Sequence, residues 1–250
     1  MTTSDFPRGL LRERSHSWNL VGVATTPGQN AQNVAPIIRS DGGGFWSCVM
    51  SDVSLSGVKG VKAHDRQRQR IATLLWRAVR QICDGGVNNI VVPRNDALFR
   101  PWPFQATSGG VAGGPAGVPH SDLAMFSDDA GYYQSMIDVT VAADAALRAT
   151  GLAIQLNWCG GLMGGESFSI QHPTFGWRLY EIATVTYDSD TAARITFMPP
   201  LREAVSVGTP LEFDRPRCVM RLARTSSMDL TVQPWTFNNA SVDFIEAPPQ

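Results

Sequence analysis

Charged side chains are scarce in this sequence: Asp, Glu, Lys and Arg make up 17% of 250 residues, and the net charge is −1. A nucleic-acid-binding protein normally has a basic excess, so we expect no nucleic-acid sequence recognition. The chain also lacks an apolar run of about 18 residues, which argues against membrane insertion. Residues 1–14 are polar and contain Arg throughout, so they do not resemble a secretory signal.

Cysteine is equally sparse and is not arranged for metal binding. The four cysteines are far apart and form no C-x-x-C pair, which makes a zinc site improbable. Each is flanked by apolar residues, so we expect four buried free thiols in a reducing compartment. They are Cys48, Cys83, Cys159 and Cys218.

Recognisable catalytic and cofactor motifs are missing as well. The tripeptide HSD at 120–122 has the residue types of a catalytic triad, but adjacent residues cannot form one hydrogen-bonded chain. The glycines at 109–117 fit neither the dinucleotide fingerprint nor the phosphate loop. No spacing of acidic residues indicates paired carboxylates for glycoside hydrolysis. The sequence therefore predicts a non-enzyme with no cofactor and no metal.

What the chain has is a pattern of short apolar segments separated by turn residues. Apolar residues make up 43%, with 23 Gly and 16 Pro. Residues 152–158 alternate apolar and polar or small side chains, as in a half-buried strand. Between 166 and 213, five such segments recur about every ten residues, which is typical of a small antiparallel barrel. We predict a mainly β fold, an antiparallel sandwich or a small barrel of SH3-like or OB-like size.

Four regions are expected from this pattern. Residues 1–40 are polar and predict an N-terminal arm. Residues 41–98 and 214–250 together predict one β-rich domain, and the break at Ser51-Asp52 suggests a β-bulge. Residues 99–135 predict a long Gly/Pro-rich interaction loop, or a disordered one, and residues 136–213 predict the barrel-like region.

One amphipathic helix is predicted over 64–83. Its apolar residues recur at i, i+3, i+4, i+7, i+8 and i+11, and Gly85-Gly86 follow its end. A basic run on a helix is usually a solvated face, but contact with an acidic neighbouring subunit is the alternative. The apolar stripe comprises Ile71, Leu74, Leu75, Ala78, Val79 and Ile82, and the arginines proposed for the interface are Arg66, Arg70 and Arg77.

The seven tryptophans fall into two groups. Trp46, Trp158 and Trp177 lie in or beside strand segments, which favours core packing over sugar binding. Trp102 and Trp235 lie beside prolines in loops and are candidates for exposed interface anchors.

Several short segments resemble a known family. These are PHSD (119–122), GESFSI (165–170), GWRLYEI (176–182), ITFMPPLR (195–202), GTPLEF (208–213) and SVDFIEA (241–247). Over roughly residues 40–247, the chain resembles tail proteins of siphophages and related prophages or gene-transfer agents, and most closely the distal tail proteins.

The resemblance implies a virion protein, assembled in the host cytoplasm, that forms part of the tail tip or baseplate. Its expected partners are copies of itself, in a ring that is hexameric in this family, and other tail proteins, namely the tail tube and the hub. Two alternatives are a tail-associated glycan-binding β-sandwich and a cell-wall hydrolase.

Overall fold

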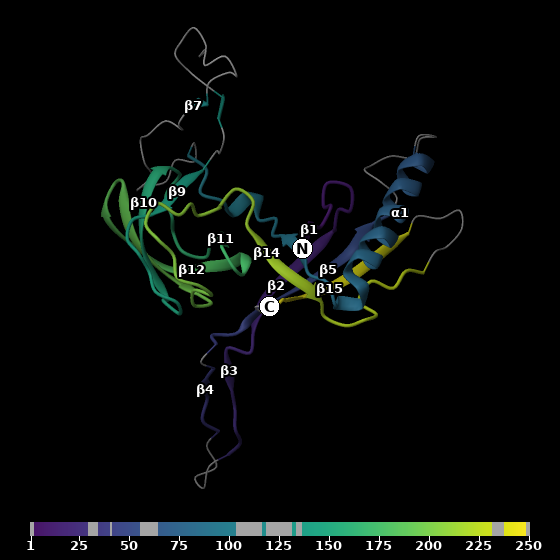
Figure 1. Ribbon diagram of the computed structural model, residues 1–250, viewed down its shortest axis with the longest axis horizontal. Helices are drawn as coiled ribbons and strands as arrows, with labels where there is room; N and C mark the ends of the chain where they lie inside the picture. Colours follow the sequence, from purple (N-terminus) through teal and green to yellow (C-terminus); the bar gives the residue numbers. More distant parts are fainter. Residues whose placement is uncertain are drawn as a thin grey trace. The chain divides into compact units, whose positions relative to one another are not determined.

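The computed structural model describes residues 3–29, 35–40, 42–55, 65–103, 117–118, 132–133, 137–231 and 238–248. Within them the fold is mainly β with one long α-helix, which confirms the predicted fold class (Figure 1). The chain divides into two compact units: unit 1 comprises residues 1–93 and 218–250, and unit 2 comprises residues 94–217.

Unit 1 is built on a six-stranded sheet. Its strand order is β1-β6-β14-β15-β5-β2, so strands distant in sequence are neighbours. The apolar side chains of the central strands alternate into the core, as Cys48 and Met50 do on β5 and Val242 and Phe244 do on β15. In sheet order, the strands are Ser4–Asp5, Ile90–Pro93, Arg217–Leu222, Asn239–Glu246, Phe45–Ser54 and Ser15–Val21.

The break predicted in the Phe45–Ser54 segment is a β-bulge. On β15, Ala240 pairs with Val53 and Val242 pairs with Met50, so one residue opposes two on β5. Asp52 adopts a φ of 53°, in the left-handed region. The bulge keeps Val53 buried on the same side as Met50.

The N-terminal segment differs from the predicted arm because two of its strands, β1 and β2, join the six-stranded sheet. Strand β2 pairs with β5 over seven residues, and Phe6 and Leu11 are buried. The strands β3 (Ala24–Thr25) and β4 (Ile38–Arg39) pair with each other in a separate two-stranded sheet (Figure 1). Strand β2 lies at the edge of the sheet, where alternate side chains stay solvated. Its polar composition is therefore similar to that of an extended arm.

The predicted helix is present as α1, Asp65–Cys83. It is followed by the short 3₁₀ turn Asp84–Gly86, in which Gly85 has a φ of 62°. That left-handed conformation is the usual way for a helix to end at glycine. Trp76 is fully buried, and its indole N–H donates to the Met228 carbonyl at 3.2 Å, which anchors the middle of α1 within unit 1.

Unit 2 contains a five-stranded antiparallel sheet in the order β11-β12-β13-β10-β9. In chain order the strands are β9 (Asp138–Val141), β10 (Gly151–Trp158), β11 (Ser167–His172), β12 (Gly176–Ser189) and β13 (Ala192–Met198). Residues 94–103 include the 3₁₀ turn Ala97–Phe99. Beyond residue 103, the structure describes two short paired strands of the predicted long loop, β7 (Gly117–Val118) and β8 (Tyr132–Tyr133).

The two edges of this sheet are joined by residues 209–213, so the sheet curls into a small barrel (Figure 1). On one side the Leu211 N–H donates to the Val139 carbonyl at 2.9 Å. On the other side Ser169 and Glu212 exchange both backbone hydrogen bonds at 2.9 Å. This segment removes part of the exposed edges of β9 and β11, which would otherwise be open to further pairing.

The barrel is filled by an aromatic cluster centred on Phe168. Its ring lies 5.5 Å from Tyr180, 5.6 Å from Phe197 and 5.5 Å from Phe213, between ring centroids. All four side chains are fully or almost fully buried. Aromatic pairs at such distances add to the stabilisation from burial alone, so this cluster is the main core of unit 2.

Candidate functional site

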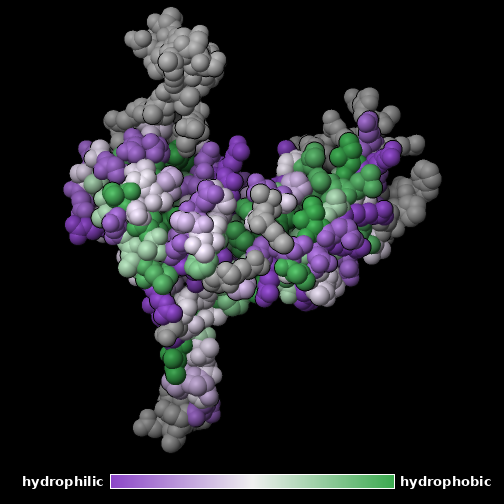
Figure 2. All heavy atoms as spheres, in the orientation of Figure 1, coloured by the Kyte–Doolittle hydropathy of each residue, from purple (hydrophilic) through white to green (hydrophobic). Residues whose placement is uncertain are grey.

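Helix α1 has two apolar faces, and only one of them is used by the core. The buried face consists of Ala72, Trp76, Val79 and Cys83. A second apolar stripe with similar spacing lies about 100° away around the helix axis, which is the rotation of one residue. It comprises Ile71, Leu74, Ala78 and Ile82, of which the three large side chains are 45%, 51% and 44% exposed. Figure 2 shows hydrophobic side chains along α1 beside hydrophilic ones.

Arginines border the exposed stripe on the side away from the core. Arg70 is four residues before Leu74 and Arg77 is three residues after it, so both are its neighbours on the helix surface. Both arginines are exposed. The backbone of Arg66 belongs to α1, but its side chain lies outside the described part of the structure. The exposed stripe of α1 is therefore an apolar strip with a cationic margin.

Trp102 occupies a different environment from the one expected of an exposed anchor. It is half-buried against the core of unit 2, and its indole N–H donates to the Ala97 carbonyl at 2.9 Å. The Arg100 guanidinium lies 5.6 Å from its ring centroid. Its backbone packs so closely on Gly160 that a Cβ there would clash with the Trp102 carbonyl oxygen. Trp235 lies outside the described residues.

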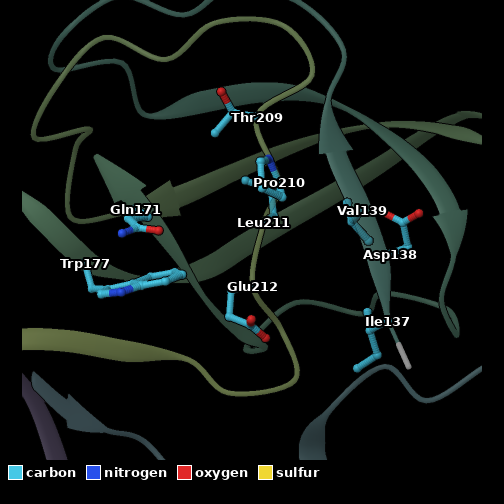
Figure 3. Close-up of a pocket in the computed structure, with 9 residues that line it drawn as sticks. All are labelled: Ile137, Asp138, Val139, Gln171, Trp177, Thr209, Pro210, Leu211 and Glu212. Atoms are coloured by element: carbon cyan, nitrogen blue, oxygen red, sulfur yellow. The ribbon is translucent and has the colours of Figure 1, made fainter. Parts of the chain in front are cut away.

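A pocket of about 290 Å³ lies on unit 2 beside the segment that closes the barrel (Figure 3). Its lining comes from β9, from the β11–β12 hairpin and from residues 209–212. Figure 3 shows Trp177 and Asp138 on opposite sides, with the closing segment between them. The lining residues are Ile137, Asp138, Val139, Gln171, Trp177, Thr209, Pro210, Leu211 and Glu212.

Trp177 is not a core residue, unlike Trp46. It is half-buried and pairs with the exposed Gln171 across the hairpin, so the two side chains lie on the same face of the sheet. The Arg217 guanidinium lies 4.4 Å from the centroid of the Trp177 ring. Trp158, also half-buried, pairs with Asp138. The prediction of core packing therefore holds for Trp46 and is wrong for Trp158 and Trp177.

The turn between β11 and β12 is fixed by polar contacts. Glu203 accepts hydrogen bonds from the Thr174 N–H at 3.2 Å and the Thr174 hydroxyl at 3.0 Å. Next to the turn, His172 Nε2 lies 2.7 Å from the Tyr180 hydroxyl, and the oxygen of that hydroxyl accepts from the Arg202 N–H at 3.1 Å. Burial lowers the pKa of His172 to about 4, so this imidazole is neutral at pH 7.

The side chains of His172 and Tyr180 are enclosed by the protein, which limits their chemistry. His172 is 2% exposed and Tyr180 is completely buried, so neither can reach a substrate from solvent in this conformation. Their arrangement holds the hairpin that carries Gln171 and Trp177. We therefore assign His172 and Tyr180 a positioning role for the pocket.

The four cysteines are free and buried, as predicted. Burial raises the pKa of the Cys83 thiol to about 11, and burial together with Asp138 raises that of Cys159 to about 12. Among the described residues, no three His, Cys, Asp or Glu side chains are grouped to hold a metal ion. The tripeptide 120–122 lies outside the described residues.

Comparison with known proteins adds no family. No protein-family model matches the chain, and no curated protein sequence matches it. Within the described residues, no helix is both long and apolar enough to cross a membrane.

Sequence reasoning missed both the exposed stripe of α1 as a separate face and the pocket on unit 2. The stripe could have been found, because the sequence contains a second apolar series at helical spacing that could supply the core face instead. This series comprises Ala72, Trp76, Val79 and Cys83. The pocket had one signal, the aromatic Trp177 two positions before the apolar Leu179 and so on the same face of the predicted strand.

Proposed function

We propose that this chain is a structural subunit of the tail tip or baseplate of a long-tailed bacteriophage, a distal-tail-type ring protein that joins the tail tube to the hub. The observation that carries the proposal is the exposed stripe of α1. A helix normally buries its apolar face, and large exposed apolar patches mark interaction sites.

The cationic margin indicates the character of the partner. Arg70 and Arg77 are exposed beside Leu74, so a surface with apolar side chains and nearby carboxylates would complement them. In a ring, that surface belongs to the next copy or to a neighbouring tail protein. The β3–β4 hairpin offers a second contact, since Ile37 and Ile38 are 78% and 53% exposed.

The test is assembly of the purified chain. Size-exclusion chromatography with light scattering, and negative-stain electron microscopy, should reveal rings, either alone or with purified tail-tube protein. Leu74→Glu places a charge in the stripe without disturbing the core, so it should abolish assembly. Leu147→Glu is the matched control, because Leu147 is exposed to a similar degree (56%) but lies in unit 2.

Charge reversal tests the margin independently. Arg70→Glu combined with Arg77→Glu should weaken assembly, and raised salt should weaken assembly of the unmodified chain. The proposal would be contradicted by a chain that remains monomeric and does not bind tail-tube protein, or by equal assembly of the Leu74→Glu and Leu147→Glu variants.

A further inference from the structure

The pocket on unit 2 combines an aromatic ring with side chains that can bind hydroxyl groups. In Figure 3 the Trp177 ring is seen nearly edge-on, with Gln171 and Pro210 on one side of its plane. The Gln171 amide can both donate and accept hydrogen bonds, and the Thr209 hydroxyl, which donates to the Ser206 carbonyl at 2.8 Å, can accept one. Ligand pockets are commonly built in this way, from apolar walls and a few convergent polar groups.

The charges around the pocket favour a neutral ligand. Glu212 lies 4.0 Å from the Arg217 guanidinium, measured between Oε2 and Nη2, and its other oxygen accepts the Arg215 N–H at 2.8 Å. Arg217 in turn lies over Trp177. The Glu212 charge is thus offset by protein groups, and Asp138 opposes binding of an anion. A phosphate-bearing ligand such as a nucleotide would meet two carboxylates and no free cation among the lining residues.

The pocket is also prepared before a ligand arrives. Gln171 and Trp177 face each other in register at the two ends of the turn between β11 and β12. That turn is fixed by Glu203, and Arg178 Nε donates to the Phe175 carbonyl at 3.1 Å. The backbone that carries these two residues is therefore already ordered, and binding need not order it.

We infer that this pocket binds a neutral pyranose unit of a glycan, with the sugar ring lying against Trp177 and its hydroxyls bonded to Gln171 and Thr209. A sugar ring has one apolar C–H face and a polar rim, which matches an aromatic surface bordered by amide, hydroxyl and carboxylate groups. The volume of about 290 Å³ lies at the lower end for ligand pockets, so it suits one or two sugar rings. This inference does not depend on the assembly of the chain into a tail.

The probe is a printed array of neutral hexose and N-acetylhexosamine oligosaccharides, followed by calorimetric titration of the best-bound oligosaccharide. Trp177→Ala and Gln171→Ala should each weaken binding at least tenfold. Thr186→Ala is the matched control, because Thr186 is an exposed residue of the same strand, β12, outside the pocket. It should bind as the unmodified chain does.

Trp177→Ala could unfold the hairpin, so Gln171→Ala, at an exposed side chain, keeps the test valid. Circular dichroism of each variant checks that the barrel remains folded. Absence of binding to every neutral oligosaccharide on the array would overturn the inference. So would binding that Gln171→Ala leaves unchanged, or binding restricted to anionic glycans.

Discussion

Lowering the pH from 7.5 to 5 should destabilise unit 2 through His172. Its pKa is about 4 in the folded chain and 6.5 in an unfolded one. Between these values the unfolded state binds the extra proton and the folded state does not, so stability is complete above pH 6.5 and falls as the pH drops. Burial is the main cause, the nearby Arg178 adds to it, and Glu203 opposes it.

The size of the effect follows from the pKa difference. At 1.36 kcal/mol per unit, a change from 6.5 to about 4 corresponds to about 3 kcal/mol in total. The free energy of unfolding falls gradually with pH, and proton linkage gives a decrease of about 2 kcal/mol between pH 7.5 and pH 5. The pKa of Glu203 is lowered below its usual value of 4.5, so its own contribution is lost below this window.

The assay is urea denaturation at pH 7.5, 6 and 5, with hydrogen-exchange mass spectrometry of peptides from β11 to β13 to identify the unfolding of unit 2. His172→Gln is the control variant, because its amide stays neutral and can still hydrogen-bond to Tyr180 in either direction. The unmodified chain should lose about 2 kcal/mol more than this variant. Equal pH dependence in the two chains would refute the role of His172.

Three further predictions test the core. Phe168→Ala should destabilise unit 2 by about 3–5 kcal/mol in urea denaturation, since it removes the centre of the aromatic cluster; no loss would contradict that role. Gly160→Ala should cost about 1–3 kcal/mol because its Cβ would meet the Trp102 carbonyl oxygen, whereas Gly9→Ala, with open space around it, should not. A disulfide reagent such as DTNB should react with no thiol of the folded chain at pH 8 and with four after denaturation.

The strands of unit 2 could be predicted because their pattern is local. Leu152, Ile154 and Leu156 alternate with polar or small residues, and all three are buried on β10. The bulge at Ser51-Asp52 was also visible, since the alternation changes phase there. Such patterns depend on the two-residue period of a strand and not on which strand lies next to it.

The core face of α1 could not be assigned by the same reasoning. Periodicity indicates that a helix is amphipathic, but α1 is apolar over two adjacent stripes. Choosing between Leu74 and Trp76 requires knowing which side meets the sheet, and that depends on strands up to residue 246. The pocket was hidden for a similar reason, because Asp138, Gln171 and Glu212 converge only once residues 209–213 close the barrel.

In the chain, the barrel unit is inserted between two strands of the unit 1 sheet. The chain leaves unit 1 after β6 and returns at β14, and these two strands are neighbours. Bringing together the ends of a flexible loop of that length would cost on the order of 4 kcal/mol in chain entropy. If the barrel folds first, its two ends are already close together, and pairing of β6 with β14 no longer requires this loss of chain entropy. The same arrangement makes the insert replaceable: a tight turn in its place would leave the six-stranded order intact, so evolution could exchange the whole barrel without redesigning its host.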